Sequence, residues 1–225
     1  MSSAQPPAAF AGWPSEAIAW FEGIEADNSR AWFQANRDTY DRCVRAPLEA
    51  LVAELEPSFG GGREAKVFRP NRDVRFSADK SLYKTWAAAV VGAYYVQVSA
   101  NGLVAGGGYH HVASDQLERY RKAAGAEASG TELAGLVDAI ERDEAEIGGD
   151  QLRSAPRGWS RDHPRIRLLR HKGLTAYRTW PPEPWLATAA ARDRVESAWR
   201  GFQPLLDWLE REVGPSQLPE DQRRR

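Results

Sequence analysis

The sequence predicts an α+β fold: a single domain with an antiparallel sheet, built around a central hairpin and packed by N- and C-terminal helices. Two observations predict it. Apolar residues recur at helical spacing at both ends of the chain, and a strand–turn–strand pattern centred on Asn101-Gly102 lies between them. We place the domain at residues 14–214. We expect residues 1–13 and 215–225 to be flexible, because chain termini are commonly loose.

The N-terminal part is predicted to be helical. Ser15 can cap a first helix that ends near Ala26, and residues 27–29 then interrupt the pattern and offer a cap for a longer helix. Pro47 lies inside that longer helix and should kink or restart it, because proline has no N–H to donate. Residues 57–62 predict a glycine-rich break. The apolar stripe of the longer helix is Phe33, Tyr40, Val44, Leu48, Leu51 and Leu55.

Strand patterns follow the helices. Residues 65–69 predict a short strand, and residues 90–99 predict a longer one by their alternation. Asn101-Gly102 is a strong hairpin signal, with positive φ expected at both turn positions. Residues 103–108 would form the returning strand. The face of the longer strand that should be buried carries Tyr94, Val96 and Val98.

The second half of the chain returns to helices. We expect helices over residues 114–124 and from 131 to about 147, a short helix over 164–172, and a strand over 174–180. The final helix has the clearest periodicity and could serve as a dimer seam, although we favour packing on its own core. Its stripe is Val195, Trp199, Phe202, Leu206, Leu209 and Val213.

Composition excludes several classes of protein. The 225 residues carry a formal net charge of −1, which argues against a nucleic-acid protein held by its overall field. Cys43 is the only cysteine, so no internal disulfide and no cysteine-based zinc site can form. It could be a low-pKa thiol, but an inert helix residue is the simpler reading. No stretch resembles a signal peptide or a membrane span, and we expect a cytoplasmic protein.

The most informative segment is a dense run of charge over residues 69–84. A near-neutral chain has gathered cations here, and they must be solvated, paired internally or directed at an anion, because a buried unpaired charge is costly. Guanidinium groups recognise phosphate or carboxylate in a bidentate fork. The candidate ligand-binding cations are Arg69, Arg72, Arg75, Lys80 and Lys84, against the carboxylates Asp73 and Asp79.

Three readings of this run remain open. In the first, the cations bind a small anionic ligand. In the second, Asp73 or Asp79 acts as a general base and Tyr83 donates or positions a proton. Whether the protein is an enzyme stays open. In the third, an Arg–Asp network locks the strand end to the first helices through Asn28 and Arg30, within a non-enzymatic module that binds protein or nucleic acid.

Other constellations are weaker. The four histidines lack the paired spacing of metal sites, and adjacent His110 and His111 would face opposite ways in a strand, so we expect no metal. The glycines at 106–108 lack the lysine and spacing of a phosphate loop, and no dinucleotide fingerprint occurs, so we expect no cofactor. An aromatic platform for bases is conceivable, but nucleic acid ranks below a small ligand. Its members would be Trp86, Tyr94, Tyr95 and Tyr109.

The charged run resembles the signature of an uncharacterised bacterial family, domain of unknown function 2461. The resembling pattern is Arg69-x-x-Arg72-Asp73-x-Arg75-Phe76-x-x-Asp79-Lys80-x-x-Tyr83, closed by Tyr83-Lys84-Thr85. Residues 28–33 resemble the family's Asn-x-Arg-x-Trp-Phe element, and residues 168–172 its Leu-Leu-x-x-Lys. The chain departs from the pattern at Asp27, where many members carry asparagine, and at Leu82, where proline is common. The resemblance implies no established activity.

Overall fold

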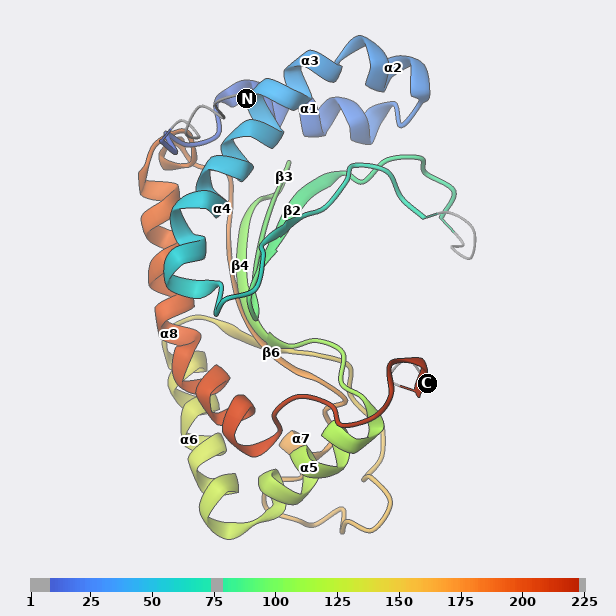
Figure 1. Ribbon diagram of the computed structural model, residues 1–225, viewed down its shortest axis with the longest axis vertical. Coiled ribbons are helices and arrows are strands. Elements are labelled where there is room, and N and C mark those ends of the chain that lie inside the picture. The colour runs from blue at the N-terminus through green and yellow to red at the C-terminus, as the bar shows by residue number, and fades with distance from the viewer. Residues whose placement is uncertain (1–8, 74–78, 223–225) are drawn as a thin grey trace. The chain divides into compact units, whose positions relative to one another are not determined.

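The computed structural model describes residues 9–73 and 79–222 and has an α+β architecture, as the sequence predicts (Figure 1). Its antiparallel sheet has the strand order β1-β2-β3-β4-β6-β5. Pairing in β1–β2, β2–β3 and β5–β6 is antiparallel. The strands are β1 (Lys66–Val67), β2 (Trp86–Val91), β3 (Tyr94–Ser99), β4 (Gly102–Tyr109), β5 (Glu146–Gly148) and β6 (Leu174–Trp180).

The helices precede and follow the central strands. None of them, within the described residues, is long and apolar enough to cross a membrane. The first group is α1 (Ser15–Ala26), α2 (Arg30–Ala35), α3 (Arg37–Thr39), a π-helical turn (Tyr40–Arg45) and α4 (Ala46–Phe59). The second is α5 (Ser114–Gly125), α6 (Glu127–Arg142), α7 (Ile166–Leu169) and α8 (Ala190–Glu212), with 3₁₀ turns at Pro184–Ala187 and Glu220–Gln222.

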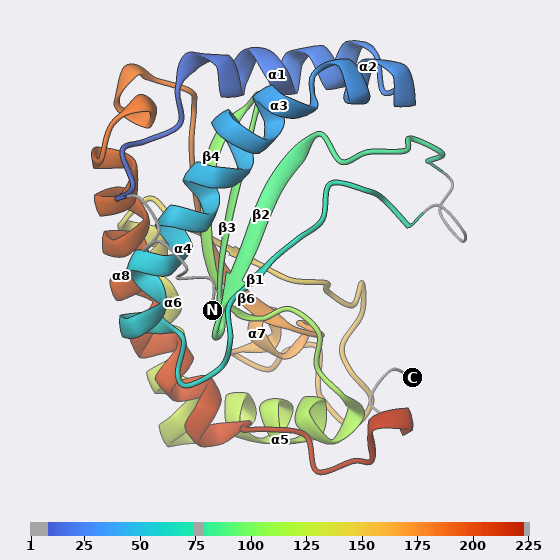
Figure 2. The ribbon, with the colours of Figure 1, turned by 45° about the horizontal axis from the view of Figure 1, so that its top comes forward.

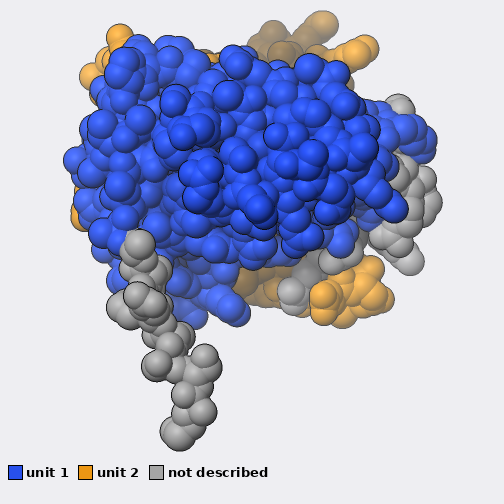
Figure 3. Space-filling model, turned by 90° about the horizontal axis from the view of Figure 1, so that it is seen from above, with its two compact units in different colours: residues 1–105, 179–197 blue, residues 106–178, 198–225 orange. Residues whose placement is uncertain are grey.

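The chain forms two compact units. Unit 1 comprises residues 1–105 and 179–197, and unit 2 comprises residues 106–178 and 198–225 (Figure 3). The candidate cation run lies in unit 1.

The core of unit 1 joins the N-terminal helices to the first strands. Helix α4 packs on β2, and the predicted stripe from Phe33 to Leu55 is buried. Pro47 opens α4 directly after the π-helical turn, so the predicted restart is confirmed. The break predicted at 57–62 begins too early, because α4 continues through Pro57 to Phe59. Proline there removes only one hydrogen bond near the last turn, and the Gly60 N–H still donates to the Glu56 carbonyl at 2.8 Å.

Residues 10 and 13 are packed against the rest of unit 1, although the sequence predicts a flexible terminus up to residue 13. Phe10 and Trp13 are 5% and 1% exposed, and the Trp13 indole N–H donates to the Val44 carbonyl. Packing therefore begins before residue 14. Ser15 is the first residue of α1 and not its cap, because Pro14 occupies the cap position and no side chain bonds there. The predicted second cap is confirmed: Ser29 Oγ accepts from the Trp32 N–H at 3.1 Å.

Two hairpins make the centre of the sheet. The strand expected over 90–99 is really the end of β2 and all of β3, separated by a turn at Gly92. Gly92 has φ of 60°, and a Cβ there would lie 2.4 Å from the Phe59 carbonyl oxygen, so glycine is required. The predicted hairpin is confirmed, but its turn lies one residue earlier, at Ala100-Asn101, because β3 ends at Ser99 and β4 begins at Gly102. Tyr94, Val96 and Val98 are buried, as expected. Of Asn101 and Gly102, only Gly102 has positive φ, at 106°.

Unit 2 contains α5, α6, α7 and the C-terminal part of α8, together with β5, most of β6 and the end of β4. The Arg165 guanidinium closes the end of α5 by donating to the carbonyls of Ala124, Gly125 and Ala126. The Trp208 indole N–H donates to the Ser129 carbonyl and ties α8 to α6. The predicted stripe of α8 is buried, as packing on its own core requires.

Three elements of this half differ from expectation. Helix α6 begins at Glu127, four residues before Thr131, and ends at Arg142, so Ile147 belongs to β5 and pairs with Ala176. The helix expected over 164–172 is only α7, because residues 170–172 pair their backbone with residues 150–152. The segment after α8 is also bonded: Ser216 Oγ and the Gln217 N–H both donate to the Asp115 carboxylate.

Candidate functional site

The charged run forms a two-stranded extension of the sheet, which we call the arm and define as residues 68–73 and 79–85. Figures 1 and 2 show these segments leaving β1 and β2 side by side, in cyan to green. The Arg72 N–H donates to the Leu82 carbonyl at 3.0 Å, and the Lys84 N–H donates to the Pro70 carbonyl at 2.8 Å. Arg75 lies outside the described residues.

Tyr83 anchors the arm to the first helices. Its ring is 5% exposed and stacks on Phe33, with centroids 4.1 Å apart and planes inclined by 3°. The Asn28 side chain holds the backbone of the same residue: its Oδ1 accepts from the Tyr83 N–H at 2.9 Å, and its Nδ2 donates to the Tyr83 carbonyl at 3.1 Å. Asn28 therefore links the first helices to the arm through the Tyr83 backbone. The predicted Arg–Asp network through Asn28 and Arg30 stays a prediction.

Arg72 and Asp79 form an ion pair across the arm. Arg72 Nη1 lies 2.5 Å from Asp79 Oδ2, and the two side chains are 33% and 48% exposed. The Ser81 hydroxyl and the Ser81 N–H also donate to Asp79. The Ser81 hydrogen bonds, with a smaller contribution from Arg72, hold the pKa of Asp79 below its usual value. Asp79 is therefore an ionised partner that organises Arg72.

Lys84 is a half-buried cation of the arm. Its ammonium donates to the Arg69 carbonyl at 2.6 Å and lies 5.1 Å from the Trp86 ring centroid and 5.6 Å from that of Phe68. Burial lowers the pKa of Lys84, and the charges of Arg69, Arg72 and Lys66 lower it further. Four cations therefore lie close enough to interact.

The charge of this group is only partly neutralised. Within the part of the chain that the structure describes, Arg69, Lys84 and Lys66 have no carboxylate partner, while Arg72 has Asp79. We call Lys66, Arg69, Arg72 and Lys84 the cation cluster. Lys66 was missed by the sequence reading because it precedes the charged run. The available signal was its position two residues before Phe68, since residues two apart in a strand share a face. In the structure the Lys66 ammonium lies 5.8 Å from the centroid of the Phe68 ring.

The other candidates are less closely tied to the cluster. Asp73 and Lys80 are exposed residues of the arm, and each makes interactions of its own. The catalytic reading of Asp73, Asp79 and Tyr83 stays a prediction. Among the described residues, no group of three or more histidine, cysteine or acidic side chains is placed to hold a metal ion.

Two further sequence candidates are clarified by the structure. Cys43 is 1% exposed, and burial raises the pKa of its thiol, as expected for an inert residue. His110 and His111 do not face opposite ways: they follow the end of β4, and their ring centroids lie 4.2 Å apart.

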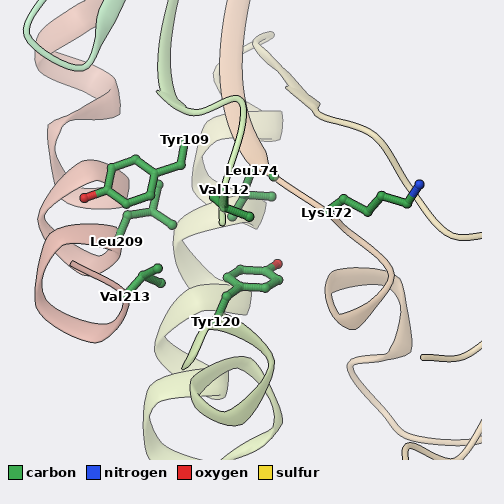
Figure 4. Close-up of a pocket in the computed structure, with 8 residues that line it drawn as sticks. Tyr109, Val112, Tyr120, Lys172, Leu174, Leu209 and Val213 are labelled. Carbon is green, nitrogen blue, oxygen red and sulfur yellow. The ribbon is translucent and has the colours of Figure 1, made fainter. Parts of the chain in front are cut away.

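Unit 2 contains a small cavity beside β4 and α8 (Figure 4). Its volume is about 10 Å³, enough for one water molecule at most. The tyrosine hydroxyls around it have partners elsewhere: Tyr120 donates to the Leu168 carbonyl, and Tyr109 to Glu210. A cavity of this volume has no room for a substrate. It is lined by Tyr109, Val112, Tyr120, Lys172, Gly173, Leu174, Leu209 and Val213.

Comparison with known families gives one match, described as "Conserved hypothetical protein (DUF2461)", over residues 16–208. The chain belongs to the DUF2461 family. The match covers well over half of the chain, from α1 into α8, and includes the whole arm. No curated protein and no solved structure matches the chain. DUF2461 membership therefore confirms the resemblance and assigns no function, so the chemistry of the arm has to carry any proposal.

Proposed function

We propose that the arm of this DUF2461 protein binds a small anionic group of the phosphate or carboxylate type. The ligand-binding residues would be those of the cation cluster, Lys66, Arg69, Arg72 and Lys84, with Lys80 and Arg75 as further candidates from the sequence. The observation that carries the proposal is the crowding of three further cations around Lys84, with one carboxylate partner, Asp79, for the four among the described residues.

Electrostatics favours an external anion at such a place. Each cation raises the energy of its neighbours, and an anion bound between them relieves this repulsion. Lys84 is held by the Arg69 carbonyl and two rings, so little side-chain entropy remains to be lost on binding. Arg72 is likewise held in position by Asp79 and offers its remaining N–H donors.

The test is a titration with inorganic phosphate, followed by calorimetry and by thermal melting. We expect millimolar phosphate to bind the wild-type protein and to raise its melting temperature, because a ligand that binds only the folded state stabilises it. Lys84→Met should abolish most of this shift while keeping the aliphatic contact with Phe68 and Trp86. Arg63→Gln is the matched control, because Arg63 is an exposed cation of unit 1 outside the cluster. The proposal would be refuted if phosphate left the melting temperatures of the wild-type protein and of Arg63→Gln unchanged.

The second candidate is a structural Arg–Asp network within a protein- or nucleic-acid-binding module, and the Arg72–Asp79 pair favours it. Arg72→Ala separates the two readings within the same set of melts. A half-exposed pair contributes about 0–1 kcal/mol, so a small loss of stability combined with loss of the phosphate shift supports a ligand site. A loss of about 3–5 kcal/mol would instead show that the pair acts as scaffold.

A further inference from the structure

The arm has two different faces. Tyr83 points inward onto Phe33, and successive side chains of a strand alternate, so Leu82 and Lys84 point outward. Arg72 is paired with Leu82 across the arm, and residues directly opposite in an antiparallel pair share a face. The Lys84 ammonium lies over the rings of Phe68 and Trp86. We call the side that carries Phe68, Arg72, Leu82, Lys84 and Trp86 the outward face.

This face is apolar as well as cationic. Leu82 is 42% exposed and is the one large hydrophobic side chain of the described residues that is exposed. Phe68 and Trp86 are half-buried, and their rings meet edge to face with centroids 6.3 Å apart. A ligand that consisted of an anion alone would leave these groups unused.

The cations are also spread along the arm. Lys66 and Arg72 are six residues apart, and a fully extended segment of that length would span about 20 Å at roughly 3.3 Å per residue; the bend at Pro70 makes this segment shorter. One phosphate group bound beside Lys84 need not contact every cation of the row at once. Several phosphates, repeated along a chain and alternating with planar apolar groups, would match both the row of charges and the exposed rings.

We propose that the outward face of the arm binds a single-stranded nucleic acid. This inference rests on the anion-binding function proposed above and names its ligand class. The backbone phosphates bind the cation cluster, and unpaired bases stack on Trp86 and Phe68 beside Leu82. A base that stacks on the exposed part of Trp86 lies beside the Lys84 ammonium, which keeps its place over the ring and contacts the neighbouring phosphate. A duplex does not offer its bases for stacking and binds more weakly.

The net charge of −1 limits the expected strength of this binding. It excludes attraction by the field of the whole chain but leaves local contacts with the cation cluster. With four cations, the logarithm of the affinity should fall with the logarithm of salt concentration at a slope of about −3 at most, from roughly −0.7 per phosphate on a single strand.

The experiment measures fluorescence anisotropy of labelled oligo-dT and oligo-U of about 15 nucleotides at roughly 50 mM salt. Competitors are unlabelled strand, duplex of equal length, and inorganic polyphosphate with a similar number of charges. We expect the unlabelled strand to compete at least tenfold better than polyphosphate or duplex. Lys84→Met and Trp86→Leu should each weaken binding about tenfold, Leu82→Ser several-fold, and the control Arg63→Gln not at all.

The outcomes separate this inference from the proposed function. If phosphate binds but polyphosphate competes as well as the strand, and Leu82→Ser has no effect, the nucleic-acid inference is overturned and the anion site stands. If neither phosphate nor the strand binds, both fail. Leu82→Ser keeps the test decisive should Trp86→Leu fail to fold, because the Leu82 side chain is exposed and not part of the core.

Discussion

At the scale of single residues, Asn28 does most to define where the arm lies. Its side chain accepts from the Tyr83 N–H and donates to the Tyr83 carbonyl, and it also donates to the Ile24 carbonyl near the end of α1. One amide thus joins the end of a helix to the base of the arm. Asparagine suits this place because its amide both accepts and donates, whereas a carboxylate only accepts.

Asn28→Ala should therefore lower the free energy of unfolding by about 2–3 kcal/mol, because it leaves the Tyr83 N–H and carbonyl without their partner. Asn28→Asp keeps the acceptor and should lose less. Urea denaturation of the three proteins measures the difference. Equal losses for alanine and aspartate, or no loss in either, would contradict this role. Weaker phosphate binding in Asn28→Ala would further indicate that the anchor positions the cation cluster.

At the scale of secondary-structure elements, α6 and α8 of unit 2 border an open cleft of about 190 Å³. The cleft is lined by Leu136, Ala139, Ile140, Asp143, Ala145, Gly201, Phe202, Pro204 and Leu205. Gly201 lies inside α8, and a Cβ built there meets no atom within 4 Å. Gly135 in α6 has the same open surroundings. Neither glycine is required by crowding.

Gly201→Ala and Gly135→Ala should each raise the free energy of unfolding by about 0.5–1 kcal/mol, because alanine loses less backbone entropy in a helix. Gly130→Ala is the control of opposite sign, since its Cβ would lie 2.3 Å from the Ala124 carbonyl oxygen. Thermal melting of the three variants checks the pattern. Destabilisation by Gly201→Ala would show that the cleft does not have the shape described.

At the scale of the whole molecule, the limits of the folded part extend beyond residues 14–214. Phe10 and Trp13 are buried, and residues 216–217 bond to Asp115. A chain of residues 14–214 should therefore be less stable than one of residues 9–222, by at least the roughly 3–5 kcal/mol that removal of a buried tryptophan side chain costs. Chemical denaturation of the two chains tests this. Equal stability would show that the flexible-terminus expectation holds after all.

The sequence was most informative where local patterns agree with long-range packing. The stripes of α4 and α8, the hairpin before Gly102 and the restart at Pro47 follow from spacing and backbone chemistry alone. The two-residue β1 and three-residue β5 show the limit, since strands this short depend on a partner from elsewhere in the chain. Sequence spacing likewise made α7 too long, because backbone pairing of residues 170–172 with residues 150–152 competes with the helix.

The same division applies to the candidate site. The sequence by itself determined the family, the α+β class and the presence of an excess of cations near residue 70. Only the tertiary structure decided which of them share a face: it buried Tyr83 against Phe33, paired Arg72 with Asp79 and added Lys66 to the group. The physical reason is that charge along a chain is a local property. Its neutralisation depends on side chains brought together by pairing between distant segments.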